Sequence, residues 1–152
     1  MKKNLILSGI IASAILLGAL NFVSSKNEVA EAEIKQLVES AYVHGAFNEL
    51  NPETMANGFH KDFAIFSAKG EELSRYEIED WVGSVKKRKG SEKFDPKNNV
   101  WQHNFAIVDA TGSSAIVKIE LSNDGKHIYT DYLSLLKFDS GWKIVAKVYT
   151  KH

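Results

Sequence analysis

Two residues in the C-terminal third, His103 and Asp131, have the chemistry of a general base. His103 lies in the alternating segment from Val100 to Asp109, which predicts that it shares an inward face with Trp101, Phe105 and Ile107. A buried imidazole that titrates near neutral pH could act as a base or as a hydrogen-bond partner of a ligand. The alternative is a structural side chain tied to a backbone carbonyl or to Tyr132.

Asp131 is an acid within a segment that otherwise reads as a strand. An acid in an apolar pocket could serve as the base of an enolisation. Alternation places Asp131 opposite Lys147 and Tyr149 on the neighbouring strand, which favours a cross-strand charge pair instead.

Aromatic side chains with polar atoms could stack a flat organic ligand, or they could belong to the core. Thr130, Tyr132 and Ser134 form a row of hydroxyl groups along one strand, and this row favours Tyr132 as a ligand contact. The predicted ligand-binding residues are Tyr42, Trp81, Trp101, His103, Thr130 and Tyr132.

Composition argues against several other functions. The five histidines lack the spacing of a metal pair, there is no cysteine, and no glycine-rich phosphate loop occurs, so neither a metal nor a cofactor is expected. The formal net charge of +0 gives no basic surface for nucleic acid. The 152 residues suit a single domain.

The segment from Ile128 to Tyr149 predicts a long antiparallel hairpin with Asp139-Ser140-Gly141 as its loop. If Phe138 pairs with Trp142, one face carries the residues Trp142, Ile144, Ala146, Val148, Thr130 and Tyr132, and this face is expected to point inward.

The remaining elements follow from periodicity and caps. Helices are expected from Asn27 to Phe47, after Asn51-Pro52, and from a capping box at Ser74–Glu77. Strands are expected over 59–67, 100–109 and 114–122, the last with Ala115, Val117, Ile119 and Leu121 inside. This order predicts an α+β fold in which a curved antiparallel sheet wraps the N-terminal helices.

Three runs near the C-terminus and one earlier segment resemble the signature of the "putative lumazine-binding" family of the NTF2-like superfamily. They are Thr130-Asp131-Tyr132-Leu133-Ser134-Leu135-Leu136-Lys137, Gly141-Trp142-Lys143-Ile144-Val145, Lys147-Val148 and Phe59-His60-Lys61-Asp62-Phe63, with Lys61 where the family usually has proline. The resemblance covers roughly Ile34 to Tyr149 and implies a cone-shaped fold with an open mouth. This fold hosts isomerases, dehydratases and binding modules, so fold alone does not choose among them.

The resemblance and the residues together predict a module that binds a small, flat or apolar organic molecule without strong catalysis. The alternatives are an isomerase- or dehydratase-like enzyme with His103 or Asp131 as base, and a structural or partner-binding dimer.

Residues 1–25 predict a secretory signal, with a basic start at Lys2-Lys3 and an apolar run from Leu5 to Val23. Cleavage is expected after Ser25 or after Ala32, leaving the domain over 26–152 exported to the periplasm or secreted. The alternative is an uncleaved inner-membrane anchor formed by residues 5–23.

Four apolar residues fall on the face opposite Trp142, where no helix remains to cover them. An uncovered apolar patch marks an interface. NTF2-like proteins commonly dimerise through the outer sheet face, so the resemblance implies a homodimer through Leu133, Leu135, Val145 and Tyr149.

Overall fold

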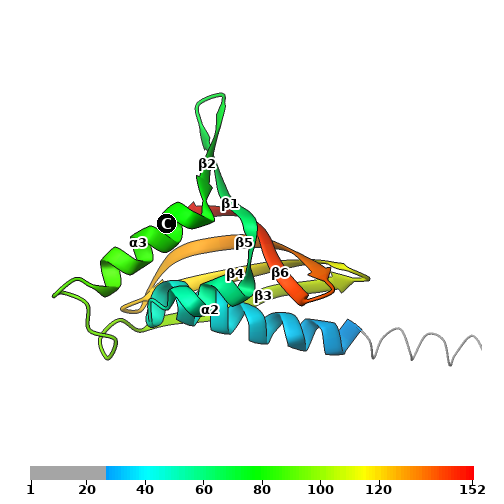
Figure 1. Ribbon diagram of the computed structural model, residues 1–152, viewed down its shortest axis with the longest axis horizontal. Helices are drawn as coiled ribbons and strands as arrows, with labels where there is room; N and C mark the ends of the chain where they lie inside the picture. The colour runs from blue at the N-terminus through cyan, green and yellow to red at the C-terminus, as the bar shows by residue number, and fades with distance from the viewer. Residues whose placement is uncertain (1–26) are drawn as a thin grey trace, which may run out of the picture.

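The computed structural model describes residues 27–152, in which helices pack against one side of a curved six-stranded sheet (Figure 1). Helical residues 27–37 lead into the π-helix η1 (Val38–Asn48), and α2 (Pro52–Gly58) and α3 (Ile78–Lys89) follow. The strands are β1 (Phe59–Lys69), β2 (Glu72–Glu77), β3 (Trp101–Thr111), β4 (Ser114–Asn123), β5 (Lys126–Phe138) and β6 (Gly141–Lys151). The sheet order is β2-β1-β6-β5-β4-β3, which confirms the predicted α+β cone.

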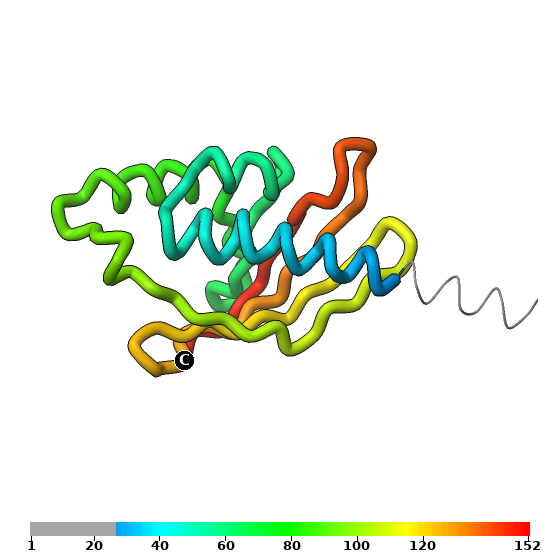
Figure 2. Tube along the Cα trace, turned by 90° about the horizontal axis from the view of Figure 1, so that it is seen from below, coloured from blue at the N-terminus to red at the C-terminus, as the bar shows by residue number. Residues whose placement is uncertain are grey.

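The N-terminal helix crosses the concave face of the sheet, as the blue and cyan segment in Figure 2 shows. In η1 the hydrogen bonds skip five residues instead of four, so residues five positions apart come to lie over one another. Tyr42 and Phe47 are such a pair, with ring centroids 5.2 Å apart. The wider turn therefore directs two large rings into the same part of the core.

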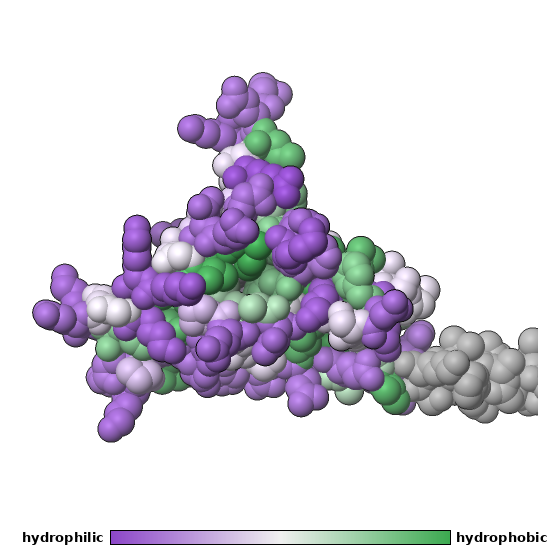
Figure 3. Space-filling model, viewed as in Figure 1, coloured by the Kyte–Doolittle hydropathy of each residue, from purple (hydrophilic) through white to green (hydrophobic). Residues whose placement is uncertain are grey.

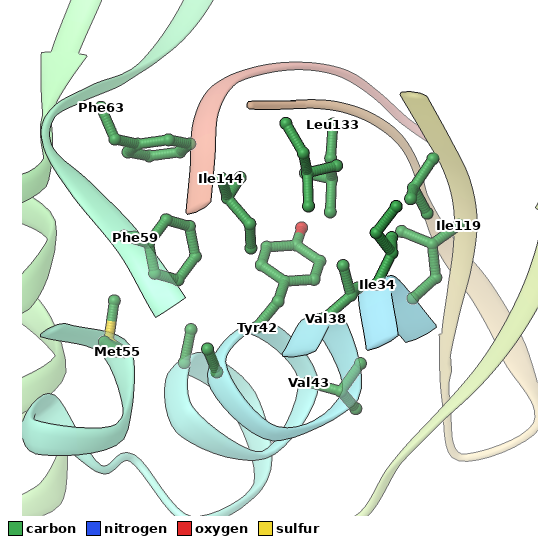
Figure 4. Close-up of a cluster of buried hydrophobic side chains, with 14 of the residues drawn as sticks. Ile34, Val38, Tyr42, Val43, Met55, Phe59, Phe63, Ile119, Leu133 and Ile144 are labelled. Carbon is green, nitrogen blue, oxygen red and sulfur yellow. The ribbon is translucent and has the colours of Figure 1, made fainter. Parts of the chain in front are cut away.

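The core lies between η1 and the concave face of β4, β5 and β6. Figure 4 shows the Tyr42 ring in the middle of this cluster, between Phe59, Ile144 and Leu133, with its hydroxyl oxygen toward the strands. Strand β4 contributes the inward residues Ala115, Val117, Ile119 and Leu121, as its alternation predicted. Tyr42, predicted as a ligand-binding residue, is fully buried at the centre of this core.

The capping box predicted at Ser74–Glu77 is wrong, because these residues form strand β2. They pair antiparallel with β1 from Ala64 to Ser67, and α3 begins only at Ile78. Pairing with β1 is favoured over the local helix cap, because it satisfies the backbone hydrogen-bonding groups of the segment through a neighbouring strand. The hairpin of β1 and β2 projects from the body, and Figure 3 shows hydrophobic side chains in green along it.

A bulge at Val145 makes the predicted faces of β6 wrong beyond Ile144. Near the turn Leu135 pairs with Ile144, whereas beyond the bulge Ser134 pairs with Ala146 and Leu133 with Lys147. One extra residue moves every later side chain of β6 to the opposite face. Trp142 and Ile144 point inward as predicted, but the inward residue beyond the bulge is Lys147 and not Ala146 or Val148.

In β5 the error comes from the register at the turn, where Lys137 and not Phe138 pairs with Trp142, and it also changes the proposed dimer surface. Tyr132 is 46% exposed on the outer face, whereas Leu133 and Leu135 are each 1% exposed within the core of a single chain. Leu133 and Leu135 therefore cannot form an interface between copies. Dimerisation itself stays a prediction.

A second bulge, at Ala106 in β3, corrects one more residue. Phe105 pairs with Ile119 and Ile107 pairs with Lys118, so the alternation skips a residue between them. Ile107, predicted to share the inward face with His103, is 47% exposed on the other face.

The close approach of α2 to the N-terminal helix gives the first prediction, on Gly58. A Cβ atom at Gly58 would lie 2.1 Å from the Cβ of Ala41. Gly58→Ala should lower the free energy of unfolding by about 1–3 kcal/mol, the usual effect of overpacking, as measured by urea denaturation.

Gly83 in α3 provides the matched control, because nothing lies within 4 Å of a Cβ added there. Gly83→Ala should raise the free energy of unfolding by about 0.5–1 kcal/mol, since alanine is the better helix former. Equal effects of the two substitutions would contradict the predicted clash with Ala41.

Candidate functional site

Three polar side chains meet inside the apolar core: Tyr42 from η1, Asp131 from β5 and Lys147 from β6. The Tyr42 hydroxyl donates to Asp131 Oδ2 at 2.6 Å, and Lys147 Nζ donates to the Tyr42 hydroxyl oxygen at 2.6 Å. Lys147 Nζ also lies 2.9 Å from Asp131 Oδ1, an ion pair without the alignment of a hydrogen bond. The predicted cross-strand pair of Asp131 is thus confirmed, on the buried face of the sheet.

Aromatic rings surround the Lys147 ammonium on its remaining sides. Its Nζ lies 4.9 Å from the ring centroid of Tyr149 and 5.0 Å from that of Tyr42. The centroids of Trp81, Phe47 and Tyr129 follow at 5.7, 5.8 and 5.8 Å. A cation is attracted to the electron-rich face of such rings. The rings therefore offset part of the cost of burying this charge.

Burial and the Asp131 carboxylate act on the pKa values of the two neighbours. Burial lowers the pKa of Lys147 from its ordinary value, and the nearby Asp131 opposes that shift. Burial, followed by the charge and hydrogen bond of Asp131, raises the pKa of Tyr42 well above its ordinary value. Tyr42 is accordingly a neutral hydrogen-bond donor, while Lys147 gives up its proton more readily than a surface lysine.

A pocket of about 310 Å³ opens onto Lys147. Its lining comprises Phe47, Ile65, Ser67, Tyr76, Trp81, Arg88, Tyr129, Lys147 and Tyr149. The walls are largely aromatic, with a lysine and an arginine as cations. Apolar walls with a few placed polar groups are typical of small-molecule sites.

A larger hollow of about 500 Å³ lies beside the start of the N-terminal helix, near the turn between β3 and β4. Its charged lining residues, Glu33 and Lys137, form an ion pair at 3.3 Å with both side chains about half exposed. Such a pair contributes little and directs no buried group into the hollow. The pocket at Lys147 is therefore the better candidate site despite its smaller volume.

The predicted site residues divide between the pocket and other places. Trp81 lines the pocket, and Tyr42 and Asp131 lie behind Lys147 at 0% exposure. Trp101 stacks on Tyr129, a lining residue, at a centroid distance of 6.0 Å.

His103, Thr130 and Tyr132 lie elsewhere. His103 Nε2 faces Glu39 Oε1 at 3.9 Å and belongs to no lining of this pocket. The Thr130 hydroxyl lies 3.1 Å from His127 Nε2 and 3.0 Å from His152 Nε2. The inward placement of Thr130 and Tyr132 is wrong, because Phe138 pairs with Gly141 and not with Trp142, which puts Asp131, Leu133 and Leu135 on the Trp142 face instead.

Sequence reasoning missed Lys147, Tyr149, Tyr129, Phe47 and Arg88 as parts of one site. One signal was available, because Asp131 pairs with Tyr149 and Leu133 with Lys147, so Lys147 lies diagonally across from the single acid within β5 and β6. Two opposite charges in such a segment indicate a paired, buried site when the face is covered.

Within residues 27–152, no helix is long and apolar enough to cross a membrane. No three histidine, aspartate or glutamate side chains of the same range cluster as metal ligands would. The predicted signal segment 1–25 and the alternative anchor 5–23 lie outside the described residues.

Comparison with protein families matches residues 29–150 to the family described as "Putative lumazine-binding". The chain belongs to this family. The match spans η1, all six strands and the pocket, so the predicted resemblance is confirmed.

Solved NTF2-like proteins share the fold of this family member. One from Shewanella baltica OS155 is 23% identical, with a TM-score of 0.63 over 80% of this chain and 92% of that chain. Another, from Silicibacter pomeroyi DSS-3, is 20% identical, with a TM-score of 0.62 over 80% of this chain and 94% of that chain. A curated relative, "Aldolase FrzH" from Cladobotryum sp, is 26% identical over 128 residues, which cover 80% of this chain and 93% of the relative.

The buried ion pair between Asp131 and Lys147 gives the second prediction. Asp131→Asn leaves the Lys147 charge buried without its partner, which should lower the free energy of unfolding by about 3–5 kcal/mol. The double variant Asp131→Asn/Lys147→Met removes both charges and should recover part of that loss. Urea unfolding, followed by circular dichroism, measures the free energy of unfolding of the unmodified protein, the single variant and the double variant.

Lys137→Met is the matched control, because it breaks the half-exposed pair with Glu33. An exposed pair contributes about 0–1 kcal/mol, so this variant should unfold almost as the unmodified protein does. If Asp131→Asn were no more destabilising than Lys137→Met, the buried pair would not be what holds η1 to the sheet.

Proposed function

We propose that the chain is a small-molecule-binding module whose ligand is flat, carries a carbonyl or carboxylate group, and occupies the pocket at Lys147. The observation that carries the proposal is the Lys147 ammonium at the wall of an aromatic pocket of about 310 Å³. Flat rings stack on aromatic walls, and an oxygen acceptor or anion pairs with a cation that is already held in place.

The charges of the pocket support the polar part of the ligand. Lys147 lies at the inner end, and Arg88, which lines the same pocket, adds a second cation. Ser67 and Tyr76 contribute hydroxyl groups to the lining. A ligand oxygen directed at Lys147 would meet the cation within its ring of aromatic side chains.

The names of the relatives support the same ligand class. The family name refers to lumazine, a flat heterocycle with two carbonyl groups. The curated relative from Cladobotryum is named an aldolase, and aldol chemistry joins carbonyl compounds. Both point to a carbonyl-bearing ligand.

An enzyme with His103 or Asp131 as general base is the main alternative. His103 is absent from the pocket lining, and Asp131 is enclosed behind Tyr42 and Lys147. A general base must come within hydrogen-bond reach of the proton that it removes. The geometry therefore favours Lys147 as the group presented to a ligand.

Two tyrosines on adjacent strands provide the third prediction. Tyr149 lines the pocket and is 43% exposed, whereas Tyr132 is 46% exposed on the outer face. Titration calorimetry of the purified protein with lumazine and with 2-naphthoate should detect binding. Tyr149→Ala should weaken it at least about fivefold, the equivalent of one aromatic contact of about 1 kcal/mol.

Tyr132→Ala is the matched control and should leave the dissociation constant unchanged. The two variants remove the same side chain at nearly the same exposure, so a difference between them locates the ligand on the concave side. If Tyr132→Ala weakened binding and Tyr149→Ala did not, the ligand would bind on the outer face instead.

We also propose that the chain is exported, on the support of the basic start and apolar run within residues 1–25. As the fourth prediction, N-terminal sequencing of the periplasmic or secreted fraction should begin near Lys26 or Glu33. Full-length protein in a membrane fraction would support the anchored alternative, and full-length protein confined to the cytoplasm would contradict both.

A further inference from the structure

The Lys147 amine has the surroundings that covalent capture of a carbonyl compound requires, and the inference drawn from them rests on the pocket function proposed above. The amine lines the pocket, and a carboxylate oxygen of Asp131 lies 2.9 Å from it. The Tyr42 hydroxyl, at 2.6 Å, links the amine to the other oxygen of the same carboxylate. A buried ion pair that served stability alone would have no need of a pocket that opens onto its amine.

We propose that Lys147 is a catalytic residue that forms a Schiff base with an aldehyde or ketone bound in the aromatic pocket. Amines on a lysine condense with carbonyl compounds when the amine can lose its proton in an apolar site. Lys147 has a proton acceptor in contact and is 5% exposed.

The first step is a proton transfer from the ammonium to Asp131. The transfer is direct across the 2.9 Å contact, or passes through the Tyr42 hydroxyl by the two hydrogen bonds of 2.6 Å. Burial already lowers the pKa of Lys147, which increases the fraction of free amine. The amine lone pair then bonds to the carbonyl carbon, and a proton passes from that nitrogen to the former carbonyl oxygen, which gives a neutral carbinolamine.

In the second step the carbinolamine loses its hydroxyl group as water, with the proton that Asp131 returns. The nitrogen becomes an iminium, so an ammonium and a carbonyl compound have yielded an iminium and one water. The positive charge stays beside Asp131 and among the rings that surrounded the ammonium. The site therefore stabilises the product cation with the contacts that held the starting cation.

Reductive trapping provides the fifth prediction. The full chain is incubated near neutral pH with 2-naphthaldehyde and cyanoborohydride, which reduces an iminium to a stable secondary amine. Peptide mapping by mass spectrometry then locates each naphthylmethyl group. Lys147 should be labelled at least about tenfold faster than other lysines, because the pocket holds the aldehyde beside its amine whereas exposed lysines meet the aldehyde only from solution.

Two arginine variants and one competitor test the assignment. Lys147→Arg keeps a cation beside Asp131 but should abolish the fast label. Lys143→Arg, on the same strand, removes a lysine that instead donates to the carbonyl oxygen of Asn57 and should leave the fast label intact. The competitor is tested on the unmodified protein, so its result does not depend on whether a variant folds. There 2-naphthoate should slow labelling of Lys147 by occupying the pocket.

The outcomes separate this inference from the function on which it rests. Binding of 2-naphthoate with labels only on exposed lysines would overturn the Schiff base and leave the binding function standing. Absence of binding by lumazine, 2-naphthoate and the aldehyde, together with slow and scattered labels, would overturn both. A fast Lys147 label that 2-naphthoate suppresses supports both.

Discussion

The structure depends on one buried ion pair, Asp131 with Lys147, and on the Tyr42 hydroxyl that joins it. Two charges inside an apolar core are costly unless their remaining hydrogen-bonding capacity is satisfied. Here η1 supplies the phenol and two adjacent strands supply the charges. The helix must therefore lie where Tyr42 reaches both strands, which ties the position of η1 to the sheet.

The aromatic rings around Lys147 connect this constraint to the pocket. They come from η1, α3, β5 and β6, so the pocket forms only where these elements converge. The same rings that lower the cost of the buried cation provide flat apolar walls for a ligand. In the proposed binding function, stability and binding use one set of side chains, and substitutions of the rings should affect both.

Two local irregularities make this convergence possible. The π-helical turn brings Tyr42 and Phe47 over one another, and the Val145 bulge turns Lys147 and Tyr149 inward. π-Helical turns and bulges frequently occur beside functional sites, because each redirects a side chain that regular structure would point elsewhere. Without the bulge, Ala146 and Val148 would face the core, and the pocket would lack its amine.

The sequence by itself determined the α+β class, the cap of α2 at Asn51, the inward face of β4 and the pairing of Asp131 with Lys147. These follow from local chemistry and from regular alternation. Only the tertiary structure decided that Ser74–Glu77 is a strand, that Tyr42 is central, and that Tyr132 points outward. Tyr132 points outward because Phe138 pairs with Gly141 and not with Trp142, a register that alternation within one strand does not reveal. Alternation also shows which residues share a face only while a strand keeps its phase. Whether a bulge interrupts that phase depends on contacts with neighbouring strands and with η1, which are distant in the chain.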